Sequence, residues 1–443
     1  MLLLHLYLHG AWIAIVECNY RLLSKLGTTV SLLILLQSCG VILDLETQKE
    51  IIKNSKFFPT RDHISKDVIS NYQNISNKQE FDDSEVFNEF GKIDQEKSSL
   101  LTDTAKILAG MNVSDRSPLA SLENSAIWSD HRRFLSNAWS ELESQQLSKV
   151  REWQQTELAA INGSNATVFY PFSNSDFLHA YSLFPASKNF ILIGSEPVGT
   201  IPNLVRLRPS KLEGELQEVR NYLYSILPFS YFRTDNIHNL HTQEALPALY
   251  VFMARTNNRI VNVEYVGIDR FGAIQNFQPG MVSGVKITFI TQGYTEPHNL
   301  YYFSADLSNK ELERDPELAK FIDNHEHIVT YIKEASYLMQ FDSFSEIKNL
   351  ILAHSSYLLQ DDSGLPINAF DFDKWNLNFY GIYAQPANLF SDKYQPELWH
   401  FYTDKKNIKP LDFVVGHQFD VDYTNLMLAE IKNNKNSSVA ELK

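Results

Sequence analysis

The chain has 443 residues, of which 44% are hydrophobic and 21% are charged, and its mean hydropathy is −0.25. This composition is that of a globular protein, and it excludes a wholly disordered chain, a fibrous repeat and a polytopic membrane protein. The formal net charge of −14 argues against a general nucleic-acid binder, because neutralising phosphates requires clustered Lys and Arg. The two cysteines, Cys18 and Cys39, are both near the amino terminus, so the rest of the sequence provides neither a disulfide framework nor a cysteine zinc site.

The first segment, residues 1–39, has the order of a secretory signal. Arg21 and Lys25 precede the uncharged run Leu26–Leu36, and small residues follow it before Cys39. The 11 residues of that run would span about 16 Å as a helix, well short of the roughly 30 Å hydrocarbon core of a membrane. The pattern therefore favours export and processing over a membrane-spanning anchor.

The string LQSC at residues 36–39 resembles the lipobox of bacterial lipoproteins, apart from Gln37, where that family has a smaller residue. The resemblance implies a lipid on Cys39 and a place in the bacterial cell envelope, held to a membrane. Two alternatives stay open, namely a membrane-associated helix of another kind and a buried apolar helix with an incidental cysteine. Because no Lys or Arg precedes the apolar residues 1–16, the true start is expected near Leu22, or else residues 1–16 and 26–43 form a hairpin.

Residues 40–98 are predicted to form a polar tether, because they are rich in charged and amide side chains and show no lasting period. A marginal helix over residues 67–96 is the alternative. A globular domain is predicted over residues 99–431, and a polar tail over residues 432–443.

The globular part shows helical and strand patterns in alternation. Helical periodicity predicts helices over residues 100–111, 127–158, 175–184, 212–227, 244–255, 318–339 and 344–359. Apolar, β-branched and alternating runs predict strands over residues 167–172, 190–194, 259–268, 285–292, 299–305, 377–384, 413–419 and 426–431. The third helix is expected to be capped by Ser173 or Ser175. The pattern predicts one mixed α/β sheet with helices on its faces, starting with a Rossmann-like βαβ unit of parallel strands and then an antiparallel meander.

The first candidate site lies where the first two strands end. Tyr170, Ser173 and Asp176 follow the first strand, and Glu196 follows the second. Open α/β sheets bind ligands at these ends, and an acidic residue after the second strand can hold a ribose. The layout is similar to the first half of Rossmann-like methyltransferases, but the first loop has no glycine for close approach to a cofactor. The alternative is helix capping by Ser175 and Asp176, with Glu196 solvated.

A second candidate is Arg233, which could clamp a carboxylate or a phosphate, against the alternative of an ion pair with Asp235. His238 and His241 have a metal-compatible spacing, but no zincin pattern accompanies them, and no metal site is predicted. A third candidate is the run Asp361, Asp362 and Ser363, whose carboxylates could bind a cation or act as acid and base. Its alternative is the turn that ends a helix.

Three segments resemble a conserved bacterial family of uncharacterised proteins: YPFS with SEPVG at residues 170–173 and 195–199, SYLM at residues 336–339, and QDDSG at residues 360–364. The resemblance covers roughly residues 100–430 and implies one structural unit, without implying an activity. It marks Tyr170, Pro171, Ser173 and residues 360–364 as site candidates. Asn174 stands where that family has a glycine.

The sequence thus predicts an exported, lipid-anchored envelope protein that binds a ligand or has a structural role. The partner is a membrane through the lipid on Cys39, no nucleic acid is expected, and the small-molecule or protein partner and any cofactor stay unspecified. The alternative is an enzyme, methyltransferase-like or a cofactor-free hydrolase, although neither a Gly-x-Ser-x-Gly elbow nor a phosphate loop is present. The two hypotheses differ in whether Ser173, Glu196, Arg233 and Asp361 converge in one pocket.

Overall fold

The computed structural model describes residues 94–162, 166–226, 244–404, 408–417 and 420–432. These residues all belong to one of the two compact units into which the chain divides. The expected signal region, most of the expected tether and nearly all of the tail lie outside the described residues. Within the described ranges, every helix is too short or too polar to cross a membrane.

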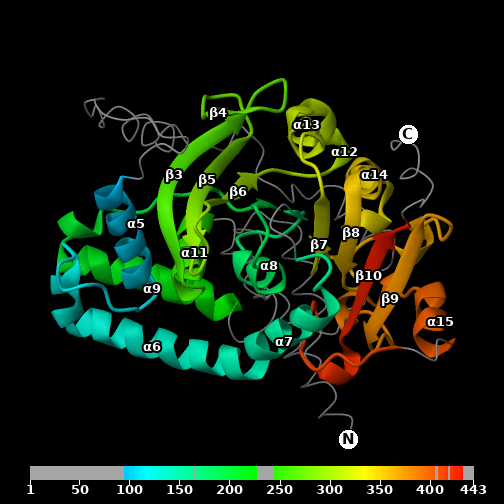
Figure 1. Cartoon of the computed structure of the whole chain (residues 1–443), viewed down its shortest axis with the longest axis horizontal. Coiled ribbons are helices and arrows are strands. Elements are labelled where there is room, and N and C mark those ends of the chain that lie inside the picture. The colour runs from blue at the N-terminus through cyan, green and yellow to red at the C-terminus, as the bar shows by residue number, and fades with distance from the viewer. Residues whose placement is uncertain (1–93, 163–165, 227–243, 405–407, 418–419, 433–443) are drawn as a thin grey trace, which may run out of the picture. The chain divides into compact units, whose positions relative to one another are not determined.

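A mixed sheet of ten strands forms the centre of this unit, in the order β4-β3-β5-β6-β2-β1-β7-β8-β10-β9 (Figure 1). The strands are β1 (Thr167–Tyr170), β2 (Asn189–Gly194), β3 (Asn258–Ile268), β4 (Ile274–Asn276), β5 (Ser283–Thr291), β6 (His298–Ser304), β7 (Ile328–Ile332), β8 (Ser355–Gln360), β9 (Trp375–Gly381) and β10 (Asn425–Ile431). The sheet confirms the predicted α/β fold class.

The five central strands, β6-β2-β1-β7-β8, are all parallel. Taken in chain order, they run outward from β1 to β2 and β6 on one side, and then to β7 and β8 on the other. The direction of winding therefore reverses between β1 and β7, which pair in parallel from Thr167 opposite Ile328. This reversal is the topological switch point of a doubly wound sheet, where such folds bind their ligands.

Antiparallel strands complete both sides of the sheet. The predicted meander is present as β3, β5 and β6, and β4 pairs with β3 at that edge. On the other side, β10 is antiparallel to both β8 and β9. The predicted βαβ unit is also confirmed, because β1 and β2 are parallel and a helix connects them.

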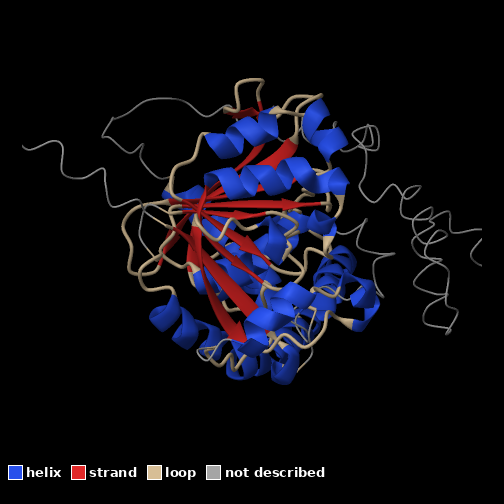
Figure 2. Ribbon diagram, turned by 90° about the vertical axis from the view of Figure 1, so that its right-hand side faces the viewer, coloured by secondary structure: helices blue, strands red, loops and turns tan. Residues whose placement is uncertain are grey.

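Helices lie on both sides of the fanned strands (Figure 2). They are α5 (Gln95–Leu108), α6 (Ala126–Leu142), α7 (Ser148–Glu157), α8 (Phe177–Leu183), α9 (Pro209–Ile226), α11 (Ala245–Arg255), α12 (Asn309–Arg314), α13 (Glu317–Asp323), α14 (Ser345–His354) and α15 (Pro396–Asp404). Every residue of β1 and β7 is buried, as expected for parallel strands covered on both faces.

The first helix begins earlier than predicted. Asp94 caps α5 by accepting a hydrogen bond from the amide of Lys97, so residues 95–98 are helical and do not belong to a tether. The hydroxyl of Ser98 donates to the carbonyl of Ile260 at 2.7 Å, which ties this turn to β3. The long predicted helix is present as α6 and α7, joined by a π-helical turn over Glu143–Leu147.

Three predicted elements are wrong. The expected helix over residues 318–339 contains the short helix α13 and the central strand β7, and the one over residues 344–359 ends at His354 and continues as β8. A short continuous apolar run looks the same in a buried helix and in a buried strand, and only the neighbouring strands decide between them. Residues 413–417, predicted as part of a strand, have no regular structure.

Candidate functional site

The segments that the sequence singled out come together at one edge of the sheet. Residues 171–176 follow β1, residues 195–199 follow β2, residues 333–337 follow β7, and residues 361–364 follow β8. Because these four strands are parallel, their carboxyl ends lie at the same edge. Segments far apart in the sequence therefore surround the switch point.

Backbone strain is concentrated in the two loops next to the switch point. Seven non-glycine residues among those described have positive φ, namely Phe172, Asn174, Asn257, His327, Glu334, Ser336 and Tyr337. Five of them lie in the loops that follow β1 and β7. The left-handed conformation costs about 1–2 kcal/mol for each such residue, and strain of this kind gathers at functional sites.

Four buried side chains form what we call the switch-point cluster: Asp176, His179, Lys333 and Glu334. The Lys333 ammonium lies 3.2 Å from Asp176 Oδ2 and 3.0 Å from Glu334 Oε1. His179 Nδ1 lies 2.7 Å from Asp176 Oδ1. The side chains are 8% exposed or less. The cluster thus joins the loop after β1 to the loop after β7.

Electrostatics make the lysine and one carboxylate of this cluster an ion pair. Burial acts to raise the pKa of Asp176, but His179 and Lys333 outweigh it and hold this pKa well below its usual range. Burial lowers the pKa of His179, so its imidazole is neutral near pH 7 and donates a hydrogen bond to Asp176. Burial also raises the pKa of Glu334 well above its ordinary value, although Lys333 opposes this shift. The cluster contains one firm pair of opposite charges, Asp176 and Lys333.

Tyr170 supports this pair from β1. Its hydroxyl donates to Asp176 Oδ2 at 3.1 Å, and its ring lies against that of Tyr331 on β7 with centroids 4.6 Å apart. The predicted candidates Tyr170 and Asp176 are thus parts of one arrangement. Asp176 also caps α8 by accepting from the amide of His179 at 3.3 Å, so capping by Asp176 is confirmed and the expected cap by Ser173 or Ser175 is wrong.

The predicted run Asp361, Asp362 and Ser363 holds the strained loop after β7. Asp361 Oδ2 accepts from the amide of Glu334 at 3.0 Å, and Ser363 Oγ accepts from the amide of Ala335 at 2.8 Å. The hydroxyl of Tyr337 donates to Asp362, whose other oxygen accepts from Asn425 at 3.0 Å. Since the run follows a strand, the predicted helix-ending turn is wrong. These three side chains position the loop that carries Lys333.

Burial and the neighbouring Asp361 raise the pKa of Asp362 to about 7. Burial likewise raises the pKa of Asp361. Both carboxyls are less than a tenth exposed, and their oxygens are engaged by protein groups. A small cavity of about 10 Å³ adjoins them between Asn425 and Tyr402, which is room for a single water molecule.

Glu196 is buried rather than solvated. The hydroxyl of Tyr222 on α9 donates to Glu196 Oε1 at 2.7 Å and is also hydrogen-bonded to Ser175. Burial raises the pKa of Glu196 to about 8, so the group is a neutral carboxylic acid near pH 7. Ser173 is used locally, because its amide and hydroxyl donate to the carbonyl of Ile193 at 2.8 and 3.2 Å. The alternative of a solvated Glu196 is therefore wrong.

The loop after β1 does not form the cradle that a Rossmann-type cofactor needs. A Cβ at Gly194 would lie 2.5 Å from the Cα of Asn174, so this loop packs directly on the end of β2. Asn174 Oδ1 also accepts from the amide of Ser195 at 3.1 Å. Protein atoms thus fill the space in which the phosphates or the amino-acid part of such a cofactor would lie, and the residues do not fit it.

Only some of the four residues whose convergence would favour an enzyme lie near one another. Ser173, Glu196 and Asp361 lie on neighbouring strand ends, but each bonds to a different local partner. Arg233, His238 and His241 lie outside the described residues. In the part of the chain that the structure describes, His, Cys, Asp and Glu form no group of three or more able to hold a metal ion.

Sequence reasoning missed Lys333, Glu334, His179, Tyr222 and Gln146. Lys333 and Glu334 were hidden inside a predicted helix, although a charged pair after the apolar run of residues 328–332 is also what a strand end looks like. The signal for His179 was its spacing of three from Asp176. Gln146 projects from the π-helical turn, and its amide nitrogen lies 3.4 Å from His179 Nε2. Such turns are frequent at functional sites.

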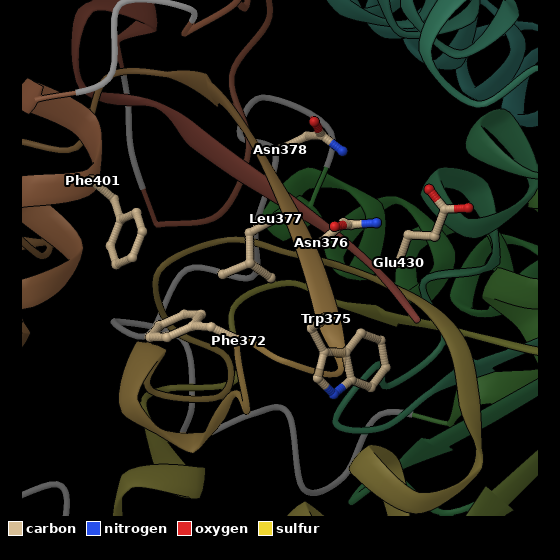
Figure 3. A pocket seen from close by; sticks show the side chains of 7 residues that line it. All are labelled: Phe372, Trp375, Asn376, Leu377, Asn378, Phe401 and Glu430. Carbon is tan, nitrogen blue, oxygen red and sulfur yellow. The ribbon is translucent and has the colours of Figure 1, made fainter. Parts of the chain in front are cut away.

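A separate groove of about 500 Å³ lies at the free edge of the sheet, beside β9 (Figure 3). Its lining side chains are Phe372, Trp375, Asn376, Leu377, Asn378, Phe401 and Glu430. They provide one carboxylate, that of Glu430, which accepts from the hydroxyl of Tyr357 at 3.2 Å. The groove has neither the strained loops nor the opposed charges of the switch point.

Comparison with known proteins adds no assignment. No protein-family model matches the chain, and no curated protein matches it.

Proposed function

We propose that this chain is an exported envelope protein whose α/β domain binds a small polar ligand at the switch point. One observation carries the proposed site. Strained, non-glycine backbone is concentrated in the two loops that flank the reversal of strand order, and these loops meet through the buried pair of Lys333 and Asp176. Backbone strain costs stability and a buried charge pair adds little net stability, so both point to a function, and they lie where doubly wound sheets bind ligands.

The proposal favours binding over catalysis. The imidazole of His179 bonds to Asp176 on one side, as in a hydrolytic triad, but its other nitrogen faces the amide of Gln146 and not a hydroxyl. A methyltransferase-like site has less support still, since the loop after β1 packs on Gly194. An enzyme without a cofactor remains the second candidate, with the Asp176–His179 pair in its favour.

Ligand binding is tested by thermal unfolding of the full chain in detergent, with millimolar amino acids, sugars or nucleotides as separate panels. We expect at least one panel to raise the Tm in a saturable way, because a ligand that binds only the folded state stabilises it. The rise should disappear in Lys333→Gln and persist in Lys286→Gln, which changes a lysine on β5 far from the switch point. If no panel raises the Tm, or if the rise survives in Lys333→Gln, the proposed site is wrong.

The envelope part of the proposal rests on the sequence of residues 1–39, with Cys39 as the lipid-bearing residue. Its test is metabolic labelling of cells with a fatty-acid probe, comparing wild type with Cys39→Ser. Label on the wild type alone supports a lipid-anchored protein. Equal label on both proteins, or none on either, refutes the lipid on Cys39 and with it this route to the membrane.

A further inference from the structure

The switch-point cluster is buried in this structure, and an irregular segment packs beside it. Residues 411–417, which we call the cover, run from the side of α7 to the end of β8 without forming a helix or a strand. The cover touches three parts of the site. Gly416 lies on Asp361, and the carbonyl of Val414 accepts from Gln146 at 3.1 Å. Burial lowers the pKa of the His417 imidazole to about 4, and the nearby charge of Lys333 adds to this shift.

Gly416 is the point at which the cover rests on the site. It has φ of +72°, and a Cβ added there would overlap Asp361 Oδ2. Asp361 in turn holds the amide of Glu334, so the cover rests on the residue that fixes the strained loop. Any side chain larger than hydrogen at position 416 must lift the cover or displace Asp361.

Side chains of the body hold part of the cover, and Leu411, Phe413 and Val415 are buried. Val415 donates its amide to Thr424 Oγ1 at 2.9 Å, and the carbonyl of Asp412 accepts from Lys149 at 2.9 Å. The ring of Phe413 packs edge-on against Trp153, with centroids 5.7 Å apart. Segments held by such contacts open at lower free energy than strands of the central ladder, which must break several backbone hydrogen bonds at once.

We propose that residues 411–417 form a movable cover over the switch-point cluster, seated by Gly416 on Asp361, and that a ligand reaches Lys333 only when this cover lifts. The inference rests on the proposed ligand site, since a cover has a purpose only where something must enter. It also accounts for the burial of a lysine and a carboxylate at a site that must meet a polar molecule.

The test measures access to Lys333 without any ligand. The folded full chain is treated briefly with N-hydroxysuccinimidyl acetate, and acetylation of each lysine is read by peptide mass spectrometry. Lys310, whose side chain is 85% exposed, is the internal reference. Gly416→Ala is compared with Gly293→Ala, a matched control in which φ is also positive, at +89°, but an added Cβ meets nothing within 4 Å.

We expect the acetylation rate of Lys333, relative to Lys310, to rise about tenfold or more in Gly416→Ala and to stay at the wild-type value in Gly293→Ala, because overpacking shifts the opening equilibrium by a decade or more. Thr424→Val is the second variant, for use if Gly416→Ala does not fold. It removes the hydroxyl that holds Val415 and should act in the same direction. Hydrogen exchange should accelerate in the cover while β7 and β8 keep their protection.

The cover is refuted if Lys333 stays as unreactive in the folded variants as in Gly293→Ala. It is also refuted if Lys333 reacts only when β7 and β8 lose protection, since the core has then opened and not the cover. If Lys333 becomes reactive but no ligand raises the Tm, the movable cover is supported and the proposed ligand site is refuted. If a ligand raises the Tm but Lys333 stays unreactive, the ligand site is supported and the movable cover is refuted.

Discussion

The ion pair between Lys333 and Asp176 should couple strongly, and the coupling can be measured with a double-mutant cycle. Lys333→Met replaces the ammonium by an apolar group of similar length and leaves the Asp176 carboxylate, 2% exposed, without its cation. Removing one partner of a buried pair costs about 3–5 kcal/mol of unfolding free energy. Replacing both, with Lys333→Met and Asp176→Asn together, leaves no buried charge unpaired, so the double variant should lose about 2 kcal/mol less than the sum of the two single losses.

The assay is urea unfolding of the full chain followed by circular dichroism, with free energies from linear extrapolation. An exposed pair provides the control, because Arg133 and Asp130 lie 2.8 Å apart with side chains 72% and 59% exposed. Its cycle should give a coupling of about 0.5 kcal/mol or less, since water screens exposed pairs. A switch-point coupling no larger than that of the control would refute the reasoning, because Lys333 and Asp176 would then not form a buried, unscreened pair.

Substitutions at three other positions test the surroundings of the site. Burial raises the pKa of Glu196 from 4.5 to about 8, so the wild type should lose about 1.4 kcal/mol of unfolding free energy per pH unit as the pH rises through this range. Glu196→Gln should remove that loss, which is measured by urea midpoints from pH 5 to 9. Ser363→Ala leaves the amide of Ala335 without its acceptor, which should cost about 1–3 kcal/mol and speed hydrogen exchange over residues 333–337. Asn174→Ala should lower the Tm more than Asn174→Gly, because both lose the bond to Ser195 but only alanine bears the left-handed penalty of about 1 kcal/mol.

Each of these results has a clear opposite. The sign of the Glu196 effect follows from proton binding, because a group that holds its proton more tightly when folded loses stabilising power above its unfolded pKa. A pH profile that is the same in wild type and Glu196→Gln would mean that the carboxyl is ionised in the fold. Unchanged exchange in Ser363→Ala would remove this hydroxyl from the support of the loop. Equal Tm values for the two Asn174 variants would mean that position 174 bears no conformational strain.

Much of the fold could be predicted from local pattern. The spacing of Leu135, Trp139 and Leu142 predicts the buried face of α6, and all three side chains are buried. The parallel βαβ unit follows from two apolar runs separated by a short predicted helix. These predictions succeed because the periodicity of a helix or a half-buried strand can be recognised within a few consecutive residues.

Prediction fails where the same residues suit two structures. Residues 328–332 carry no charged side chain, and their identity as a central strand depends on pairing with β1 and β8, which are separate segments of the sequence. Because residues 318–339 were predicted to be a helix, Lys333 was not recognised as a residue that follows a strand. The sequence therefore marked Tyr170 and Asp176 as candidates, but not Lys333, which pairs with Asp176.

The sequence by itself determined most of the local elements, the fold class and the placing of acidic and hydroxyl side chains after β1 and β2, because these depend on neighbouring residues. Only the tertiary structure decided that β7 lies beside β1, that Asp361 and Ser363 hold the loop after β7, and that Lys333 lies buried against Asp176. These facts depend on the order of strands in the sheet, which brings distant segments together and which no local period records.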